Sequence, residues 1–518
     1  MTVFLYKKEE KRTKENELNN MVTSDETLGI AFEGFLAGKN GNSGVSSHTI
    51  NLSDLESPLN LFSVPKTNTA LLSSRIAEFF PIAPIEGADQ FDFVVNPTGV
   101  EYLNLAGTRL AGRFKIVKVD ARGKEYDLDE DDDISIVNMA PSSLFRLVTL
   151  KLNNVVVNDT GTFCQYLKDA IEKSLSNNQS IKRNKLKYTE LYVEDRSGEE
   201  DIITKAGANA QSGYVIRRNF IKDSREIDFQ SELAIDLLHC KTYLLPGIQL
   251  SLKCVRNDDE MTLLGPKMDA KAKVDNSTDK IDCRYKIKIL GLRLQLEYVT
   301  LDPRFAKYHA EALERGAKAL YNFPITRISQ HLLPPGSIFH PIQHVATNIL
   351  PNQIIFGFVN NSALRPSVNV NPLKFSAKTA NLTELVVKVN GQRIKTFKTE
   401  YNVDELPLSK ALEPYAEMQK ILALDSQISP IDLSYEKFLS GLNFYVVDLT
   451  TVHHCNNYHR HPPMVGSLSV DVQMKTAHDD ALCMLSLAIY NRTITIDVTR
   501  NVEIFDGALP PNITNIKI

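Results

Sequence analysis

The segment LVTLKLNNVVV, residues 147–157, contains the pattern that decides the fold. Apolar and polar residues alternate over 148–152, so an extended chain there has one apolar face and one polar face. Asn153 and Asn154 follow, and asparagine tolerates the positive φ that a two-residue hairpin turn requires. A second short strand comes after the turn. The segment therefore predicts an antiparallel β-hairpin with one buried face.

A similar hairpin occurs later in the chain. Residues 384–394 read ELVVKVNGQRI, and their turn pair Asn390-Gly391 is the strongest short hairpin signal. The offset between the two turns, 390 − 153, is 237 residues. Each hairpin is followed by a predicted amphipathic helix with an aromatic residue near its start, over 162–175 and about 414–424. The two segments are candidate copies of one unit.

Two further matches follow in the same order. AIDLLHC at 234–240 resembles VVDLTTVHHC at 446–455, which pairs Asp236 with Asp448 at an offset of 212. PGIQLSLKCVRNDD at 246–259 resembles VGSLSVDVQMKTAHDD at 465–480, which pairs Gly247 with Gly466 at an offset of 219. A final alternating strand ends each series, over 285–299 and about 484–499. We infer two copies of one β-domain of about 210–230 residues each.

Period-two alternation dominates the sequence from about residue 75, for instance at 248–254, 292–298, 468–474 and 494–498. Such strands are typical of antiparallel sheets with one wet face, so we predict an all-β protein of two tandem jelly-roll barrels with a few short helices in the connections. Asp302-Pro303 and Gly316 bound a predicted helix of about 303–316 at the junction. The expected domains are a flexible N-terminal tail (1–60), a first jelly roll (61–302) and a second (303–518).

Composition narrows the classes of function. The 518 residues are 43% hydrophobic and 24% charged, with a formal net charge of −4, which gives no bulk attraction to nucleic acid. The six cysteines are scattered, which favours folding inside a cell, and we expect neither a signal peptide nor a membrane span. We also find no Walker loop, nucleophile elbow, HExxH motif or dinucleotide fingerprint. We therefore expect no enzyme, no catalytic residue and no cofactor.

Three long segments resemble one family of viral proteins. They are SSLFRLVTLKLNNVVVNDTGTFCQYLKDAIEKSL (142–175), LHCKTYLLPGIQLSLKCVRNDDEMTLL (238–264) and GLNFYVVDLTTVHHCNNYHRHPPMVGSLSVDVQM (441–474). They look like the double jelly-roll major capsid proteins of Polinton/Maverick elements, adintoviruses and virophages, in the adenovirus-hexon-like lineage. The resemblance extends over about 75–505. The polar segment 265–282 departs from it and is expected to be a surface loop.

The resemblance implies a structural protein of the virion capsid. Such chains form homotrimers with six similar barrels in a ring, and these pseudo-hexameric capsomers tile an icosahedral shell. The implied partners are other copies of the chain, neighbouring capsomers, and penton and minor capsid proteins. The shell would be made and assembled inside the host cell, in cytoplasm or nucleus. No specific nucleic-acid binding is implied.

Two groups of residues could instead bind a metal ion. His453, His454, Cys455, His459 and His461 lie within nine residues and are weak candidates for a zinc or other transition-metal site. The pair 459–461 has the H-x-H form found in cupins, but the acid that cupins place soon afterwards is missing. The acidic run 127–133 offers oxygen ligands for calcium without the central glycine of an EF-hand. A polar loop and a solvated tip are the simpler interpretations, so no metal is predicted.

Three functions therefore remain open at the level of the sequence. The leading one is a capsid tile. The second is a host jelly-roll protein that binds a metal or a carbohydrate, which requires the histidine-rich segment to converge on an ion. The third is a domesticated capsid-like protein with another role.

Overall fold

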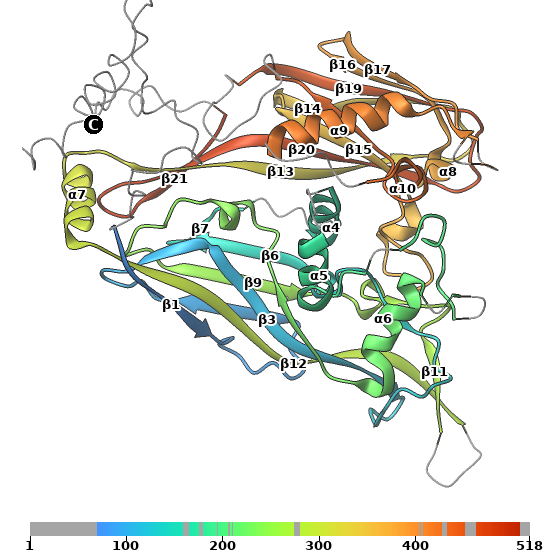
Figure 1. Cartoon of the computed structure of the whole chain (residues 1–518), viewed down its shortest axis with the longest axis horizontal. Helices are drawn as coiled ribbons and strands as arrows, with labels where there is room; N and C mark the ends of the chain where they lie inside the picture. The colour runs from blue at the N-terminus through green and yellow to red at the C-terminus, as the bar shows by residue number, and fades with distance from the viewer. Residues whose placement is uncertain are drawn as a thin grey trace, which may run out of the picture. The chain divides into compact units, whose positions relative to one another are not determined.

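The computed structural model describes residues 70–518, apart from 159–164, 176–179, 194, 206–207, 210, 274–279, 403–404, 406–407, 427–432, 451–462 and 508–518. The chain from Ala70 onward forms one compact unit. The predicted tail, 1–60, lies outside the described residues. Strand pairing within the unit divides it into a first half, which ends with β12, and a second half, which begins with β13 (Figure 1).

Two antiparallel sheets build the first half. The larger has the order β1-β12-β3, with β4 and β8 also paired to β3 and β11 paired to β12. The smaller has the order β2-β9-β6-β7, and a short ladder joins β10 to β5. The strands are β1 (Leu71–Phe79), β2 (Gln90–Val95), β3 (Tyr102–Asp120), β4 (Glu125–Tyr126), β5 (Ser135–Ile136), β6 (Phe145–Leu152), β7 (Val155–Val156), β8 (Ile227–Ser231), β9 (Leu250–Arg256), β10 (Leu263–Leu264), β11 (Asp269–Lys273) and β12 (Lys280–Leu301).

The second half repeats this arrangement. One sheet has the order β13-β20-β15-β18, with β21 paired to β20, and the other has the order β14-β19-β16-β17. The strands are β13 (Ala319–Leu333), β14 (Phe339–Ile349), β15 (Gln353–Asn360), β16 (Leu382–Val389), β17 (Gln392–Lys398), β18 (Phe444–Asp448), β19 (Val465–Met474), β20 (Leu482–Ile496) and β21 (Val502–Asp506).

The strand orders of the two halves correspond one to one. In chain order, β1, β2, β3, β6, β7, β8, β9 and β12 occupy the places of β13, β14, β15, β16, β17, β18, β19 and β20. A pair of antiparallel sheets connected in this way is a jelly roll. The prediction of an all-β protein with two tandem jelly rolls is therefore confirmed.

Short helices occupy the connections. The α-helices are α3 (Ala140–Ser143), α4 (Gln165–Leu175), α5 (Ser180–Thr189), α6 (Gly213–Ile221), α7 (Pro303–Glu314), α8 (Ala377–Ala380), α9 (Leu412–Ser426) and α10 (Tyr435–Ser440). The 3₁₀ turns are η3 (Lys222–Ser224), η4 (Asp236–His239), η5 (Asp259–Met261) and η6 (Asn361–Leu364). Helix α7 links the two halves, and the Asp302 carboxylate caps it by accepting a hydrogen bond from the Arg304 backbone N–H at 2.9 Å.

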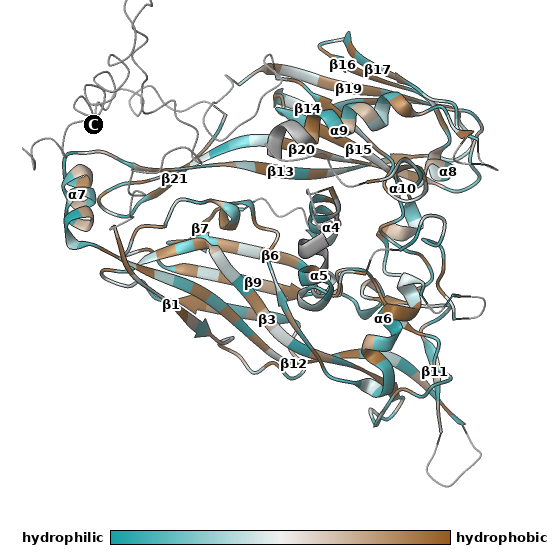
Figure 2. Ribbon diagram, in the orientation of Figure 1, coloured by the Kyte–Doolittle hydropathy of each residue, from teal (hydrophilic) through white to brown (hydrophobic). Residues whose placement is uncertain are grey.

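Alternation of apolar and polar residues places one face of most first-half strands in the core. Leu250, Leu252 and Cys254 of β9 are buried, while the residues between them are partly exposed. Figure 2 shows the same alternation of hydrophobic and hydrophilic residues along β3 and β12. In the second half, β15, β18 and the first half of β20 are buried at almost every position, since the barrel core covers one face and α9 packs near the other.

The two cores exchange elements across the boundary between the halves. Tyr166, Leu167 and Ile171 of α4 belong to the hydrophobic cluster of the second barrel. Tyr321 of β13 and Ile494 of β20 belong in turn to the cluster of the first barrel. The boundary at α7 therefore separates the strand pairings but not the cores, and each barrel is completed by part of the other half.

The segment 265–282 is not the surface loop that its composition predicts. Residues 269–273 form β11, which pairs with residues 280–284 of β12. The pairing gives the backbone of this polar segment regular hydrogen-bond partners, so it forms a ladder in spite of its low hydrophobicity.

Two edge strands of the second half carry features that interrupt a regular edge. Pro324 lies in β13 and Pro341 in β14, and both are exposed. His344 and Asn348 of β14 have φ of 59° and 69°, and the register with β19 shifts between Ile342 and Ala346. Proline removes a backbone donor and a bulge twists the strand, so both features oppose the addition of a further strand.

Candidate functional site: the seam between the two halves

The described residues do not contain a site with obvious catalytic or metal-binding chemistry. Within them, no three His, Cys, Asp or Glu side chains come together in a way that could hold a metal ion. The candidate ligands His453, His454, Cys455, His459 and His461 lie outside the described residues. None of the described helices is long and apolar enough to cross a membrane.

Half of the acidic run is held by a lysine and two tyrosines, while Asp127, Glu130 and Asp131 are exposed. Lys118, whose side chain is only 1% exposed, lies 2.8 Å from Asp129 Oδ2 and 2.9 Å from Asp132 Oδ2. The Tyr285 hydroxyl donates to Asp132 Oδ1 at 2.8 Å, and the Tyr214 hydroxyl donates to Asp133 Oδ1 at 2.8 Å. These partners occupy three of the carboxylates and tie this part of the run to β3, β12 and α6.

The hairpin turns of the two halves are built alike. Asn153 and Asn154 have φ of 46° and 69°, and Asn390 and Gly391 have φ of 51° and 81°. Asn153 Oδ1 accepts from the Gln249 backbone N–H at 2.8 Å, and Asn390 Oδ1 accepts from the Ser467 N–H at 2.9 Å. Each asparagine therefore makes the tight turn and also holds the neighbouring strand. Asn153 Nδ2 donates in addition to the Arg500 carbonyl of the second half at 2.8 Å.

The other proposed repeat anchors lie in less equivalent positions. Gln249 and Ser467 make the equivalent bonds to the two turns, and they are 218 residues apart. Gly247 and Gly466 are 219 residues apart, so they are displaced by one residue from equivalent positions. Asp448 ends β18, whereas Asp236 begins η4, beyond the end of the equivalent strand β8. Both glycines nevertheless leave room for a neighbour, Arg500 beside Gly247 and the Asn390 side chain beside Gly466.

The two halves meet along a polar and apolar contact surface that we call the seam. It consists of contacts between two sets of elements. From the first half come α4, η4, residues 190–217 and the hairpin end of the barrel around Val157 and Pro246. From the second half come β13, α10, the segment 365–376 and the β20–β21 hairpin. Sequence reasoning did not identify the seam as a site. The sequence gives little indication of it, because charged residues that are buried by distant partners cannot be distinguished from ordinary surface residues.

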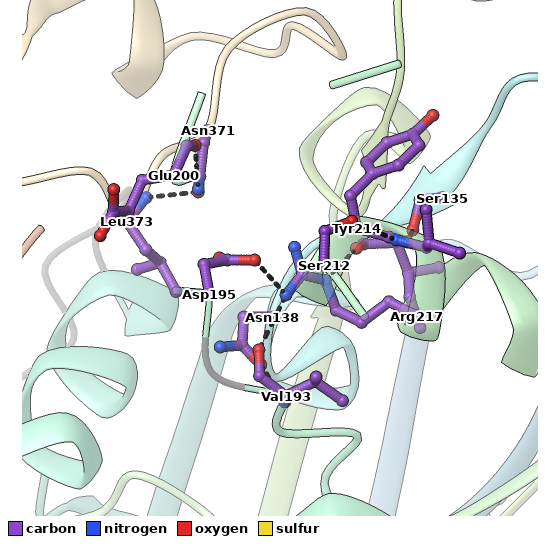
Figure 3. A network of polar contacts seen from close by, with 12 residues as sticks. Ser135, Asn138, Val193, Asp195, Glu200, Ser212, Tyr214, Arg217, Asn371 and Leu373 are labelled. Atoms are coloured by element: carbon purple, nitrogen blue, oxygen red, sulfur yellow. Dashed lines mark hydrogen bonds and ion pairs between the residues drawn. The ribbon is translucent and has the colours of Figure 1, made fainter. Parts of the chain in front are cut away.

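An ion pair between Lys437 and Glu200 lies at one end of the seam. Lys437 Nζ of α10 is 2.7 Å from Glu200 Oε1, and these side chains are only 11% and 5% exposed. The Ser440 hydroxyl also donates to Glu200 Oε1, at 2.8 Å. Asn371 Nδ2 donates to the Glu200 carbonyl at 2.9 Å (Figure 3). A Cβ at Gly441 would lie 2.9 Å from Glu200 Oε1, so glycine permits this close approach.

A buried arginine holds the first-half side of this contact in place. Arg217 of α6 is 1% exposed, and it donates to the Ile136 carbonyl at 3.0 Å, the Val193 carbonyl at 2.8 Å and Asp195 Oδ1 at 2.9 Å (Figure 3). Lys437 Nζ donates to the carbonyl of the same Asp195 at 2.6 Å. Arg217 thus fixes the irregular segment that presents Asp195 and Glu200 to the second half.

A second group of charges lies where α4 and η4 meet β13. Lys168 Nζ of α4 is 2.7 Å from Asp236 Oδ2 of η4, and the Thr326 backbone N–H of β13 donates to the same oxygen at 3.2 Å. Burial works against the charge of Lys168, but the nearby Glu172 and Asp236 carboxylates raise its pKa. Asp236 therefore joins an ammonium group of the first half to the backbone of the second.

The opposite end of the seam is formed by two arginines of the second half. Arg500 Nε donates to the Pro246 carbonyl at 2.9 Å, and Arg492 Nη1 donates to the Val157 carbonyl at 3.1 Å. Arg492 is also paired with Asp506 at 2.6 Å. The β20–β21 region thereby holds the hairpin end of the first barrel.

Two jelly rolls of the same strand order, joined along such a seam in one chain, define a double jelly-roll protein. No family model matches the sequence, and no curated protein sequence matches it. A chain in the cryo-electron microscopy structure of the Sputnik virophage is similar over 93% of this chain and 97% of its own length, with a TM-score of 0.57 and 12% identity.

Two further solved structures share the fold. The Faustovirus major capsid protein is similar over 93% of this chain and 98% of its own, with a TM-score of 0.53 and 7% identity. VP54 of the virus PBCV-1, fitted into a reconstruction of the virophage Sputnik, covers 86% of this chain and 98% of its own, with a TM-score of 0.50 and 7% identity. At these identities the similarity establishes the double jelly-roll fold.

Proposed function

We propose that the chain is a structural major capsid protein of the virophage, adintovirus and Polinton/Maverick type. The observation that carries the proposal is the duplicated jelly roll itself, which aligns with viral chains over nearly their whole length. An enzyme would be expected to add a pocket or insertion to this frame for its chemistry. Here the principal elaboration of the first barrel, residues 190–217, serves to join the two barrels.

The proposed assembly is a homotrimer that forms a pseudo-hexameric capsomer. Each chain would contribute two similar barrels held rigidly together. A trimer with threefold symmetry would then contain six similar barrels arranged as a hexagon. The seam supports this role because it fixes the angle between the two barrels within each copy. The capsomers would tile an icosahedral shell in the virion and meet penton and minor capsid proteins there, after synthesis in the host cell.

Light scattering of the purified protein at micromolar concentration tests the assembly. We expect three times the monomer mass, held by an interface above roughly 2,000 Å² of buried surface. Electron micrographs should show particles of hexagonal outline or closed shells. Protein treated with a chelator provides the matched control and should behave identically. A stable monomer, or a stoichiometric metal whose removal abolishes the folded state, would overturn the proposal.

A further inference from the structure

A small hollow lies in the seam between helix α4 of the first half and helix α10 of the second. Its volume is about 40 Å³. Apolar side chains of α4 and of the segment 373–375 form one part of its wall. The polar part of the wall consists of Asn138, Ser174, Asp195, Glu200 and Lys437. Both halves of the chain therefore contribute polar groups to one enclosed space.

The side chain of Asn138 has hydrogen-bond donors that no described residue uses. Asn138 is only 8% exposed. Its Oδ1 accepts a hydrogen bond from the Val193 backbone N–H at 2.8 Å, which identifies the other end of the amide as the donor Nδ2. Figure 3 shows this nitrogen on the side of the amide that faces away from Arg217. None of the described residues accepts from it, so a buried amide offers two donors to the hollow.

Other polar groups of the wall also have hydrogen-bonding capacity left. An ammonium group has three donors, and Lys437 Nζ uses them for the Asp195 carbonyl at 2.6 Å and for Glu200 Oε1 at 2.7 Å, which leaves one. Asp195 accepts from Arg217 through Oδ1 at 2.9 Å. Within the part of the chain that the structure describes, Asp195 Oδ2 and the Ser174 hydroxyl have no hydrogen-bond partner. The wall thus combines unused donors with an unused carboxylate acceptor.

The charge and the size of the hollow indicate which molecule it can hold. Lys437 is paired with Glu200, and Arg217 is paired with Asp195, so the charges of the wall balance and do not favour an ion. Pockets for organic ligands are larger, at about 300–1,000 Å³. A water molecule needs at least about 10–15 Å³, so the hollow has room for about three. Water also supplies both donors and acceptors, as this wall requires.

We propose that the hollow is a binding site for ordered water, and that a water molecule there bridges the two barrels. This molecule accepts from Asn138 Nδ2 and Lys437 Nζ and donates to Asp195 Oδ2, which gives it the three hydrogen bonds typical of buried water. Asn138 and Asp195 belong to the first half and Lys437 to the second, so the water extends the contact that the Lys437–Glu200 ion pair makes directly. The site lies within one chain and does not depend on the proposed capsid function.

A high-resolution crystal or cryo-electron microscopy structure of the full chain tests the site directly. We expect density for a water molecule at about 2.7–3.2 Å from Asn138 Nδ2 and at a similar distance from Lys437 Nζ or Asp195 Oδ2. The proposal is overturned if well-defined side chains surround the hollow and no density lies within hydrogen-bond distance of Asn138 Nδ2.

Filling the hollow gives opposite results for a wet and a dry site. S174L places an apolar side chain on the wall, and displaced water would leave buried polar groups without partners. The unfolding equilibrium constant, measured in urea, should therefore rise at least about fivefold relative to S174A. In a dry void the same leucine would add apolar contacts and lower that constant.

Two control variants separate this effect from changes in helix propensity. S174A removes the hydroxyl without filling the hollow, and A310L adds a leucine at an exposed position of α7, so both should remain close to wild type. S174L that is at least as stable as S174A would contradict a water-filled site. If S174L does not fold, the density beside Asn138 in the wild type decides the question.

Discussion

The two barrels differ most in the connection between equivalent strands. The first half uses residues 157–226 to pass from β7 to β8, whereas the second passes from β17 to β18 within residues 399–443. The longer connection carries α5, α6 and the segment that presents Asp195 and Glu200 to α10. The two barrels thus share one strand order. The connection in which they differ supplies contacts that join the barrels to each other.

The largest effect should follow from separating the halves. Residues 70–302 and 303–507, expressed alone, should each fail to form a folded barrel, because each lacks elements that complete its core. Soluble yield and circular dichroism would measure this. Co-expression of both pieces is the control and should restore folded protein. A cooperative unfolding transition in either piece alone would show that the barrels are independent.

Loss of Arg217 should be the most damaging single change to the long connection. R217A leaves Asp195 and the Ile136 and Val193 carbonyls without their shared donor, which should cost about 3–5 kcal/mol of unfolding free energy. Urea denaturation followed by circular dichroism measures the loss. R113A removes an exposed arginine with two surface partners and should leave the midpoint unchanged. Equal effects of the two changes would contradict the role of Arg217.

A cavity in α4 tests whether a first-half helix stabilises the second barrel. Ile171 is 1% exposed within the second core, so I171A should cost about 2–5 kcal/mol. Hydrogen exchange should show lower protection in β18, which follows the residues 441–442 that line the same hollow as Ile171, as well as in β6. I76A, at a side chain that is 72% exposed, should cost less than about 0.5 kcal/mol. Unchanged protection in β18 would show that α4 does not stabilise the second barrel.

The smallest effects should distinguish the two hairpin turns. N153A and N390A each force alanine into a positive φ, at a cost of about 1–2 kcal/mol. N153A should cost about 1 kcal/mol more, since it also removes the bond to the Arg500 carbonyl. Thermal melts would measure both, and glycine at each position keeps the turn while removing the side-chain bonds. A larger loss of stability for N390A than for N153A would contradict the contribution expected from the Asn153–Arg500 bond.

The features that could be predicted from the sequence are local in origin. Alternation over 148–152 and 468–474, the turn pair Asn390-Gly391 and the cap Asp302 each act through neighbours a few residues away. Their patterns therefore identify the strands, the turn and helix α7. The order of such elements was enough to reveal the duplication. The continuous burial of β15 and β18 could not be predicted as well from the sequence, because it depends on packing against both faces of the sheet.

The seam could not be predicted in the same way. Glu200 and Lys437 are 237 residues apart, and Arg217 has the appearance of a surface residue in a weakly periodic helix. Burial of such groups is tolerated only because partners from distant elements satisfy them. The alignment of Asp236 with Asp448 shows the same limit, since similar letters at similar spacing fall on different elements.

The exposed edges of the second barrel have a consequence for how copies of the chain can meet. Pro324 of β13 and Pro341 of β14, with the twisted stretch around His344, deny an approaching strand the regular row of donors and acceptors it would need. Both features therefore oppose the fusion of sheets from neighbouring copies into fibres. In the assembly proposed above, contact would fall to side chains and loops, whose bonds can break and re-form, and this reversibility would let a growing lattice correct its errors.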